Sequence, residues 1–222
     1  MKKLVIVLFL IAQVSMAQVS KNLGDFDKVS VFDRINVELI KSTENKIEIN
    51  GKRSDDVEVV NKNGAIKIRM KFEKLLKGDD VTAKLYYTSL QSIDASEGSY
   101  IISEDVFKQP SLDITSREGA EIRLKLDVDK AKIKSVTGGI IKISGSAENQ
   151  DASLGTGGIL EAQNLETSQT TVVITTGGEA DVRATNLVDA KVRAGGTITI
   201  FGSPKQVNKK TSLGGSIVES NR

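Results

Sequence analysis

The stretch TTGGEADVRATNLVDAKVRAGGTITIFGSP, residues 175–204, contains two Gly-Gly pairs, each followed by residues that alternate between apolar and polar. Alternation with a period of two is typical of a β-strand that has one face buried. Glycine pairs mark sharp turns, because only glycine takes a positive φ without a steric penalty. The stretch therefore predicts short strands that are separated by tight, regularly repeated corners.

The same unit recurs along more than half of the chain. The second glycines of five pairs, Gly139, Gly158, Gly178, Gly196 and Gly215, follow one another at a nearly constant spacing. Two incomplete copies, Glu97-Gly98 and Glu118-Gly119, precede them and continue the repeat toward the N-terminus. A fixed period of about 20 residues indicates a solenoid, in which each unit buries its inner face against its neighbours.

The residues between the glycine pairs identify the type of solenoid. Apolar residues alternate after each pair, as in Ile141 and Ile143, and again shortly before the next pair, as in Ala152 and Leu154. Two or three short strands in about 20 residues form one coil of a parallel β-helix. We therefore predict an all-β, parallel β-helical solenoid with glycine at one corner of every coil. The predicted corner residues are Gly98, Gly119, Gly139, Gly158, Gly178, Gly196 and Gly215.

Residues 26–90 are less regular than residues 91–222. Strand-like alternations are separated by turn signals such as Asn50-Gly51 and Asn63-Gly64, and the one helical signal is a turn around residues 71–77. An uncovered first coil would offer a sheet edge to other chains. We expect residues 26–90 to form β structure that caps or begins the solenoid, within a single domain that spans residues 18–222.

The first residues of the chain predict export. Lys2 and Lys3 precede an apolar stretch, residues 4–14, that is too short to span a bilayer. Small residues then allow cleavage after Ala17, so that the mature chain begins at Gln18. We expect the signal peptide to cover residues 1–17, and the mature chain, without a membrane span, to reach the periplasm or the cell surface.

Composition excludes several classes of function. The chain has no His and no Cys, so catalytic triads and dyads that use them, His-ligated zinc and thiol redox chemistry are unavailable. Removing Lys2 and Lys3 from the 31 basic residues leaves as many basic as acidic residues, and a neutral chain argues against a nucleic-acid partner. We predict no catalytic residues, no cofactor and no metal site.

The sequence resembles the putative auto-transporter adhesin head GIN domain, a family abundant in Bacteroidetes. The resemblance covers nearly all of the mature chain. It is carried by FDRINVELIKSTENKIEINGK (residues 32–52), LQSIDASEGSYIIS (residues 90–103), the Gly-Gly coils, and AGGTITIFGSPKQVNKKTSLGGSIV (residues 194–218). The resemblance implies a right-handed β-helix and an exported location, and it brings no established catalytic residues.

Three groups of residues are candidates for a site, each with a plain structural alternative. Glu97 and Glu118 precede corner glycines in successive coils and could form an acid/base pair as in glycosidases, or lie at solvated corners. Three acidic pairs could bind calcium, or lie in exposed turns; they are Asp127 with Asp129, Asp55 with Asp56, and Asp79 with Asp80. The aromatic residues Tyr86, Tyr87, Tyr100 and Phe107 could contact a glycan or pack in the core.

Equivalent outward positions in successive coils form a row that contains Lys142, Glu161, Asp181 and Thr199. Rows of polar side chains at a pitch of about 4.8 Å suit a repetitive, polar ligand. We expect a non-enzymatic, adhesin-like protein that binds a polysaccharide or another component of the cell envelope. The alternatives are a self-associating structural module of the envelope and, as a third choice, a carbohydrate-active enzyme.

Overall fold

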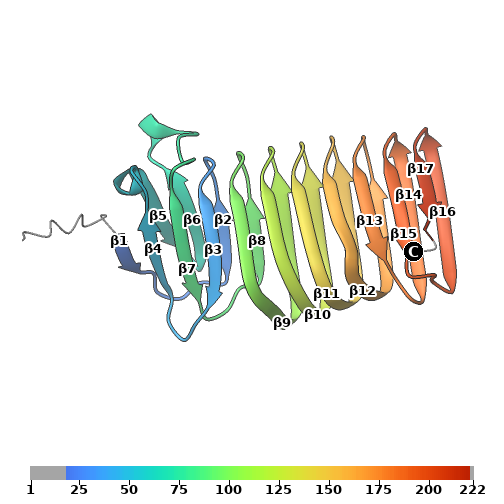
Figure 1. Cartoon of the computed structure of the whole chain (residues 1–222), viewed down its shortest axis with the longest axis horizontal. Helices are drawn as coiled ribbons and strands as arrows, with labels where there is room; N and C mark the ends of the chain where they lie inside the picture. The colour runs from blue at the N-terminus through green and yellow to red at the C-terminus, as the bar shows by residue number, and fades with distance from the viewer. Residues whose placement is uncertain (1–18, 221–222) are drawn as a thin grey trace, which may run out of the picture.

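The coils stack into a parallel β-solenoid that lies along the long axis of the molecule (Figure 1). The computed structural model of the protein describes residues 19–220. Strands in neighbouring coils pair in parallel, so that Glu121 lies opposite Ile140, Ile159 opposite Glu179, and Glu179 opposite Thr197. The predicted β-solenoid is confirmed, and these register offsets equal the spacings of the glycine pairs.

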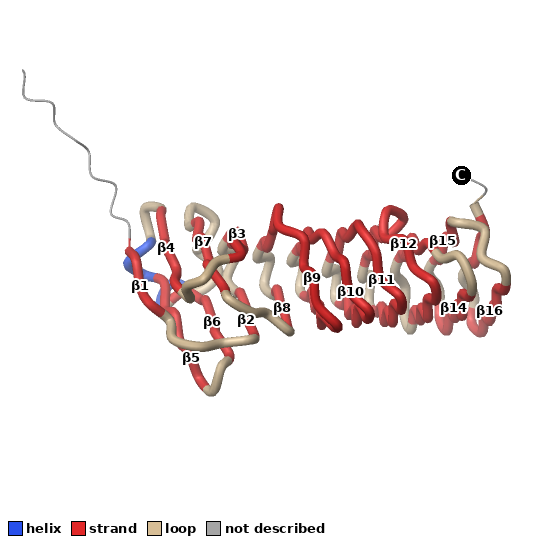
Figure 2. The backbone as a smooth tube through the Cα atoms, turned by 90° about the horizontal axis from the view of Figure 1, so that it is seen from below, coloured by secondary structure: helices blue, strands red, loops and turns tan. Residues whose placement is uncertain are grey.

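Each coil contributes to two sheets, which lie on opposite sides of the solenoid in Figure 2. The strand that follows the glycine corner enters what we call the first sheet, and the strand that returns to the corner enters the second sheet. Long strands wrap across both sheets in four coils: β9 (Tyr100–Arg117), β10 (Glu121–Val136), β11 (Ile140–Gly155) and β12 (Ile159–Ile174). Shorter strands divide the later coils: β13 (Glu179–Arg183), β14 (Leu187–Ala194), β15 (Thr197–Phe201), β16 (Gln206–Leu213) and β17 (Ser216–Glu219).

The hydrophobic core is the space between the two sheets. Alternate residues of every inner strand point into it, so that Ile141 and Ile143 face Ala152 and Leu154, and all four are buried. The same holds in later coils, where Val182 and Ile200 are buried in the first sheet and Val192 in the second. One continuous cluster of buried apolar residues runs along the described chain, as a stack of units without separate cores requires.

The N-terminal end combines two further coils with an antiparallel cap. Its elements are β1 (Val19–Asn22), β2 (Lys28–Val31), β3 (Asn36–Lys41), β4 (Lys46–Asn50), η1 (Ser54–Asp56), β5 (Val57–Lys62), β6 (Ala65–Met70), η2 (Phe72–Lys74), β7 (Thr82–Tyr87) and β8 (Ser92–Ala95). Strand β3 pairs in parallel with β7 on one side and with β9 on the other. The coil that comes first in the chain therefore lies between the coil formed by β6 and β7 and the first regular coil. Strands β1 and β4 end the first sheet and β5 ends the second sheet, all through antiparallel pairing.

The C-terminal coil carries charge at positions that are apolar elsewhere. Lys209 lies opposite buried Ala190 and Glu219 lies opposite buried Ile200, and both therefore occupy inward positions. Their side chains meet across the end of the core, with 2.6 Å between Lys209 Nζ and Glu219 Oε1. An inward-pointing charge discourages pairing at a sheet edge, so this ion pair forms a polar lid on the end of the solenoid.

Candidate functional site

A row of outward side chains crosses the first sheet along the axis of the solenoid, and we call it the central row. The strand register aligns Lys142, Glu161, Asp181 and Thr199, as the sequence predicted. The register also extends the row in both directions, to Arg123, Ile102 and Glu38 on one side and to Val218 on the other. The row therefore spans coils from the N-terminal end to the last coil.

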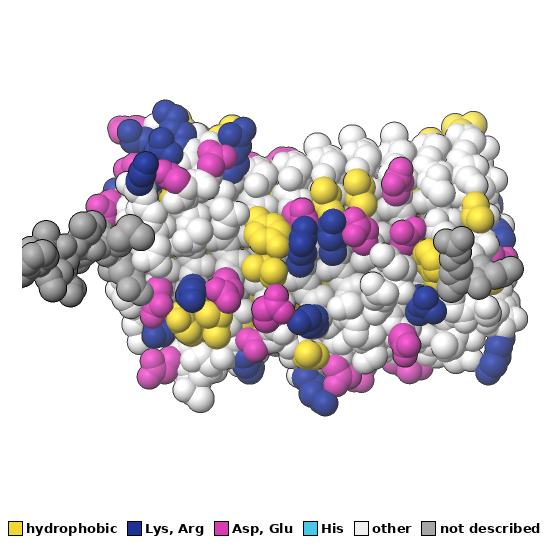
Figure 3. All heavy atoms as spheres, viewed as in Figure 1, with side chains coloured by type: hydrophobic (Ala, Val, Ile, Leu, Met, Phe, Trp, Pro, Cys, Tyr) yellow, Lys and Arg dark blue, Asp and Glu magenta, His cyan; other side chains and the backbone are white. Residues whose placement is uncertain are grey.

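The middle of the central row is a ladder of charged side chains, in which basic Arg123 and Lys142 are followed by acidic Glu161 and Asp181. Lys142 Nζ lies 3.0 Å from Glu161 Oε1 and 3.8 Å from Glu121 Oε1. Arg123 Nε lies 2.6 Å from Glu121, which raises the pKa of the guanidinium, and its guanidinium lies 5.6 Å from the ring centre of Tyr100. Figure 3 shows adjacent basic side chains here, between acidic and hydrophobic ones. Exposed ion pairs contribute little to stability, so the ladder is not what holds the coils together.

A hollow of about 300 Å³ opens beside this ladder, where two strands bulge. Ile102 pairs with Arg123 but Val106 pairs with Lys125, so β9 has two extra residues at this point. Lys142 pairs with Glu161 but Ser144 pairs with Asn164, so β12 has one extra residue. The bulged strands β9 and β12 flank β10 and β11, and the hollow lies over all four strands. Bulges of this kind redirect side chains and are frequent beside functional sites.

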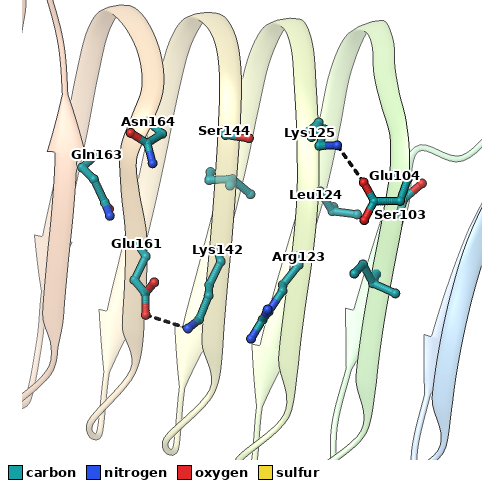
Figure 4. Close-up of a pocket in the computed structure, with 12 residues that line it drawn as sticks. Ser103, Glu104, Arg123, Leu124, Lys125, Lys142, Ser144, Glu161, Gln163 and Asn164 are labelled. Carbon is teal, nitrogen blue, oxygen red and sulfur yellow. Dashed lines mark hydrogen bonds and ion pairs between the residues drawn. The ribbon is translucent and has the colours of Figure 1, made fainter.

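Polar groups line the hollow (Figure 4). Lys125 Nζ binds Glu104 Oε2 at 2.7 Å and lowers the pKa of that carboxyl. Gln163 Oε1 is fully buried and accepts no hydrogen bond from any group in residues 19–220. A buried acceptor without a partner costs about 1–3 kcal/mol, so this side chain is an unfavourable part of the lining of the hollow.

The corner carboxylates Glu97 and Glu118 belong to a different place, a hollow of about 520 Å³ near the N-terminal end. Both residues have positive φ, 55° and 54°. Burial and the nearby carboxylate of Asp33 raise the pKa of Glu97, whereas Glu118 accepts a hydrogen bond from Ser96. The structure thus brings the two carboxylates to one hollow, together with Arg34, but away from the central row.

The acidic pairs lie in exposed turns or in ion pairs with basic neighbours. Asp127 lies 2.9 Å from Lys108, which lowers its pKa. Asp79 and Asp80 bind Arg34 and Arg53 at 3.5 and 3.2 Å, and Asp55 and Asp56 lie in η1. Among residues 19–220 no group of three or more potential ligands is arranged to hold a metal ion.

The aromatic residues divide between core and surface. Tyr87 and Phe107 are buried and stack with 5.5 Å between ring centres. Tyr86 faces outward in the first sheet, where its hydroxyl binds Glu48 Oε2 at 3.1 Å. Tyr100 is half-buried beside Arg123 and is the aromatic residue closest in position to the charge ladder.

The corner glycines fall into two structural classes. The strand register shows that Gly98 and Gly119 correspond to the first glycine of a pair, and not to the second glycine with which the sequence repeat aligned them. Gly98 aligns with Gly119, and Gly119 with Gly138, the first residue of a pair, whereas Ser99 and Ala120 take the place of Gly139. The first position needs glycine for its φ, which is 71° at Gly119, and a Cβ at Gly119 would meet nothing. In the next two coils the second position excludes a side chain by contact, because a Cβ would lie 2.3 Å from Ser116 O at Gly139 and 2.1 Å from Ser135 O at Gly158. Gly178, Gly196 and Gly215 combine both features, with φ of 128°, 108° and 103° and backbone oxygens within 2.9 Å.

Two further predictions concern export and membrane spans. The cleavage site at Ala17 and Gln18 lies outside the described residues. Within residues 19–220, no helix has the length and apolar character needed to cross a membrane.

Sequence reasoning found the central row and named Tyr100 as a candidate for a glycan contact, but it missed Arg123 and the hollow. A signal was present in the spacing of the first corner glycines, Gly98, Gly119, Gly138, Gly157 and Gly177. The first of these intervals is two residues longer, and the last is one residue longer, than the two equal intervals between them. The surplus residues are the bulges that flank the hollow.

Comparison with known proteins identifies relatives of this fold. The family model described as "Putative auto-transporter adhesin, head GIN domain" matches residues 25–204. No curated protein matches the chain.

Several solved structures share the fold. A putative adhesin from Bacteroides fragilis NCTC 9343 aligns with a TM-score of 0.86 and 20% identity, over 94% of this chain and 98% of its own. A putative adhesin from Parabacteroides distasonis ATCC 8503 aligns with a TM-score of 0.77 and 20% identity, over 93% and 97%. A putative lipid binding protein from the same strain aligns with a TM-score of 0.72 and 17% identity, over 92% and 96%. At these identities the likeness shows the fold alone.

Proposed function

The chain belongs to the putative auto-transporter adhesin head GIN domain family, and from that premise we propose that it is an exported protein that binds a polysaccharide through the central row and the hollow of its first sheet. The source of the polysaccharide is the cell envelope or another surface that the exported protein meets. The observation that carries the proposal is the hollow between two bulges, with its charge ladder.

The chemistry of this surface favours a hydroxyl-rich polymer over a small apolar ligand. Arg123, Lys142 and Glu161 offer donors and acceptors at the spacing of the coils, and Tyr100 adds an apolar face that can pack against a sugar ring. The residues that line the hollow are spread over neighbouring strands along the axis of the solenoid in Figure 4, rather than gathered around one point. A chain of sugar units can therefore continue over neighbouring coils.

We further propose binding without turnover. Glu97 and Glu118, the carboxylates most similar to a glycosidase pair, lie in the other hollow and not beside the charge ladder. The self-associating alternative is disfavoured at the C-terminal end, because Lys209 and Glu219 cover the core there with an ion pair.

A binding screen with matched variants tests the proposal. The purified protein is titrated against a panel of neutral and acidic polysaccharides, alongside the double variant Arg123→Ala/Lys142→Ala. The control is Lys130→Ala/Lys132→Ala, which removes the same charge from the second sheet and also breaks two exposed ion pairs, with Asp151 and Asp113.

We expect the first-sheet variant to lose about tenfold or more in affinity, since one charged hydrogen bond contributes about 1.5–3 kcal/mol. We expect the control to bind like the wild type. Equal binding by all three proteins, or no binding to any polysaccharide in the panel, would contradict the proposal.

A further inference from the structure

The segment between β6 and β7 carries apolar side chains that the solenoid leaves uncovered. Phe72 is 86% exposed, and Leu75 and Leu76 are each 46% exposed. The segment includes the helical turn η2, which stands out from the N-terminal end of the solenoid in Figure 1. We call residues 71–77 the apolar loop. Its leucines line the second hollow, together with Glu97 and Glu118, and the loop shares no residue with the hollow over β9–β12.

The apolar loop is held in one conformation by hydrogen bonds of its backbone, two of them to a buried carboxylate. The carboxylate of Asp33, which is buried, accepts hydrogen bonds from the backbone N–H groups of Met70 at 2.9 Å and Leu76 at 2.8 Å. Lys71 N–H donates to Asp56 O at 2.8 Å, and Gly78 N–H donates to Asp33 O at 3.0 Å. The exposed side chains are thus presented on a fixed support.

Two features of the loop are unfavourable for the folded chain alone. Leu76 has a φ of 58°, a conformation that costs a residue with a side chain energy and that Gly or Asn adopts more easily. Phe72 gains almost nothing from packing because nearly all of its surface faces solvent. Strain of this kind concentrates at functional positions, and both features are explained if the side chains contact an apolar phase outside the protein.

The charges of the loop indicate which apolar phase it meets. Lys71, Lys74 and Lys77 alternate with the apolar residues, and Glu73 is the one acidic residue among residues 71–77. Carboxylates also lie near the loop. Asp79 and Asp80 pair with Arg34 and Arg53, and the hollow beside Leu75 and Leu76 contains the carboxylates of Asp33, Glu97 and Glu118. Asp33 accepts two backbone hydrogen bonds and Glu118 accepts one from Ser96, whereas the lysines of the loop are exposed or half-buried. Lysine can bury its stem beside apolar side chains while its ammonium reaches a phosphate.

We propose that the apolar loop inserts Phe72, Leu75 and Leu76 into the interface of a lipid bilayer that carries anionic headgroups, with the lysines at the phosphates. A protein partner fits less well, because the cores of protein interfaces are depleted of lysine. The loop also projects outward as a narrow tip, whereas protein hot spots lie at the centre of broad, complementary surfaces. The contact leaves the first sheet free.

The absence of Trp from the whole sequence provides a clean reporter. Phe72→Trp places a single indole at the tip of the loop, and Val106→Trp places one at another exposed apolar position, which is 55% exposed in β9. We expect emission from the Phe72→Trp variant to shift to the blue on addition of vesicles of phosphatidylglycerol and phosphatidylcholine at equal amounts. Emission from the Val106→Trp variant should stay unchanged, and pure phosphatidylcholine vesicles should produce a smaller shift at position 72.

Co-sedimentation of the wild-type protein with the same vesicles gives a second readout. Leu76→Gly removes an inserted side chain and relieves the positive φ, so this variant should fold at least as well as the wild type. Combined with Phe72→Ala, it should weaken vesicle binding by at least about tenfold, since burial of one large apolar side chain is sufficient for that. Lys74→Glu/Lys77→Glu should remove the preference for anionic vesicles.

Two results would overturn the proposal. One is an equal shift, or none, at positions 72 and 106 in anionic vesicles. The other is undiminished sedimentation of the Phe72→Ala/Leu76→Gly variant. If the wild type binds neither kind of vesicle, the loop is not a lipid contact and a protein partner becomes the better explanation.

Discussion

Adjacent glycines in one corner, Gly157 and Gly158, should respond very differently to the same substitution. Gly157 has a φ of 75°, and a Cβ placed on it would meet nothing within 4 Å. Gly158 lacks the positive φ, but a Cβ there would lie 2.1 Å from Ser135 O and 2.6 Å from Ser135 C in the neighbouring coil. Alanine therefore tests backbone conformation at one residue and coil packing at the next.

The expected magnitudes follow from these contacts. Gly157→Ala costs about 1–2 kcal/mol for the left-handed conformation, reduced by about 0.4–1 kcal/mol because alanine restricts the unfolded chain. Thr156 beside it already has a φ of 51°. Gly158→Ala must force two backbones apart, and overpacking of this severity costs about 3 kcal/mol or more. It also disturbs the bonds from Ser135 Oγ to Gly139 O and from Ile159 N–H to Ser135 Oγ.

Chemical denaturation with urea measures both free energies of unfolding directly, and thermal melting gives a second estimate. With about 2–4 °C per kcal/mol for a domain of this size, we expect Gly157→Ala to lower Tm by a few degrees and Gly158→Ala by about 10 °C. Gly138→Ala and Gly139→Ala should repeat the contrast one coil earlier, because Gly139 faces Ser116 O at 2.3 Å. Equal losses at 157 and 158, or a larger loss at 157, would refute the assignment of the second glycine to the contact between coils.

Further predictions address the other parts of the structure. Lys209→Leu/Glu219→Leu removes the polar lid, and light scattering should show dimers or larger species; a monomer at all concentrations would show that the lid does not prevent stacking. Burial raises the pKa of Asp94 from 3.8 despite its ion pair with Arg117, so the folded state keeps this proton to higher pH than the unfolded chain. The stability of the wild type relative to Asp94→Asn should therefore fall as the pH rises above about 4, and a rise in urea titrations would contradict the assignment. Glu97→Gln/Glu118→Gln should leave polysaccharide binding unchanged; cleavage of a polysaccharide by the wild type that this variant abolishes would establish an enzyme.

The regular coils could be predicted because the steric constraint at a corner acts on single residues and can be recognised from their identity. A backbone oxygen 2.1 Å from the Cβ position of Gly158 leaves no alternative to glycine, and glycine pairs mark the equivalent corner of the later coils. The alternation of Ile141 and Ile143 is equally local, since each points into the space between the sheets. Period, strand class and the alignment of the central row all follow from such residues.

The order of the N-terminal strands could not be predicted in the same way. Val37 and Leu39 in β3 alternate like Ala83 and Leu85 in β7, and the pattern does not say which strand contacts the first regular coil. That choice depends on how the antiparallel pairs of β4 and β5 close the end of the core. The hollow was missed for a related reason: the surplus residues in β9 and β12 were visible only as longer spacings, and their bulges form through pairing with neighbouring coils.

Binding of polysaccharide fragments of increasing length tests the central claim most directly. The central row from Arg123 to Thr199 crosses five coils, a span of about 20 Å at the usual spacing between strands. For a polysaccharide that binds in the screen, calorimetric titration should show affinity that rises with fragment length until the fragment covers this span and then levels off. The Arg123→Ala/Lys142→Ala variant should lose the rise. Full affinity for a single sugar unit, or a length dependence that this variant retains, would contradict recognition along the first sheet.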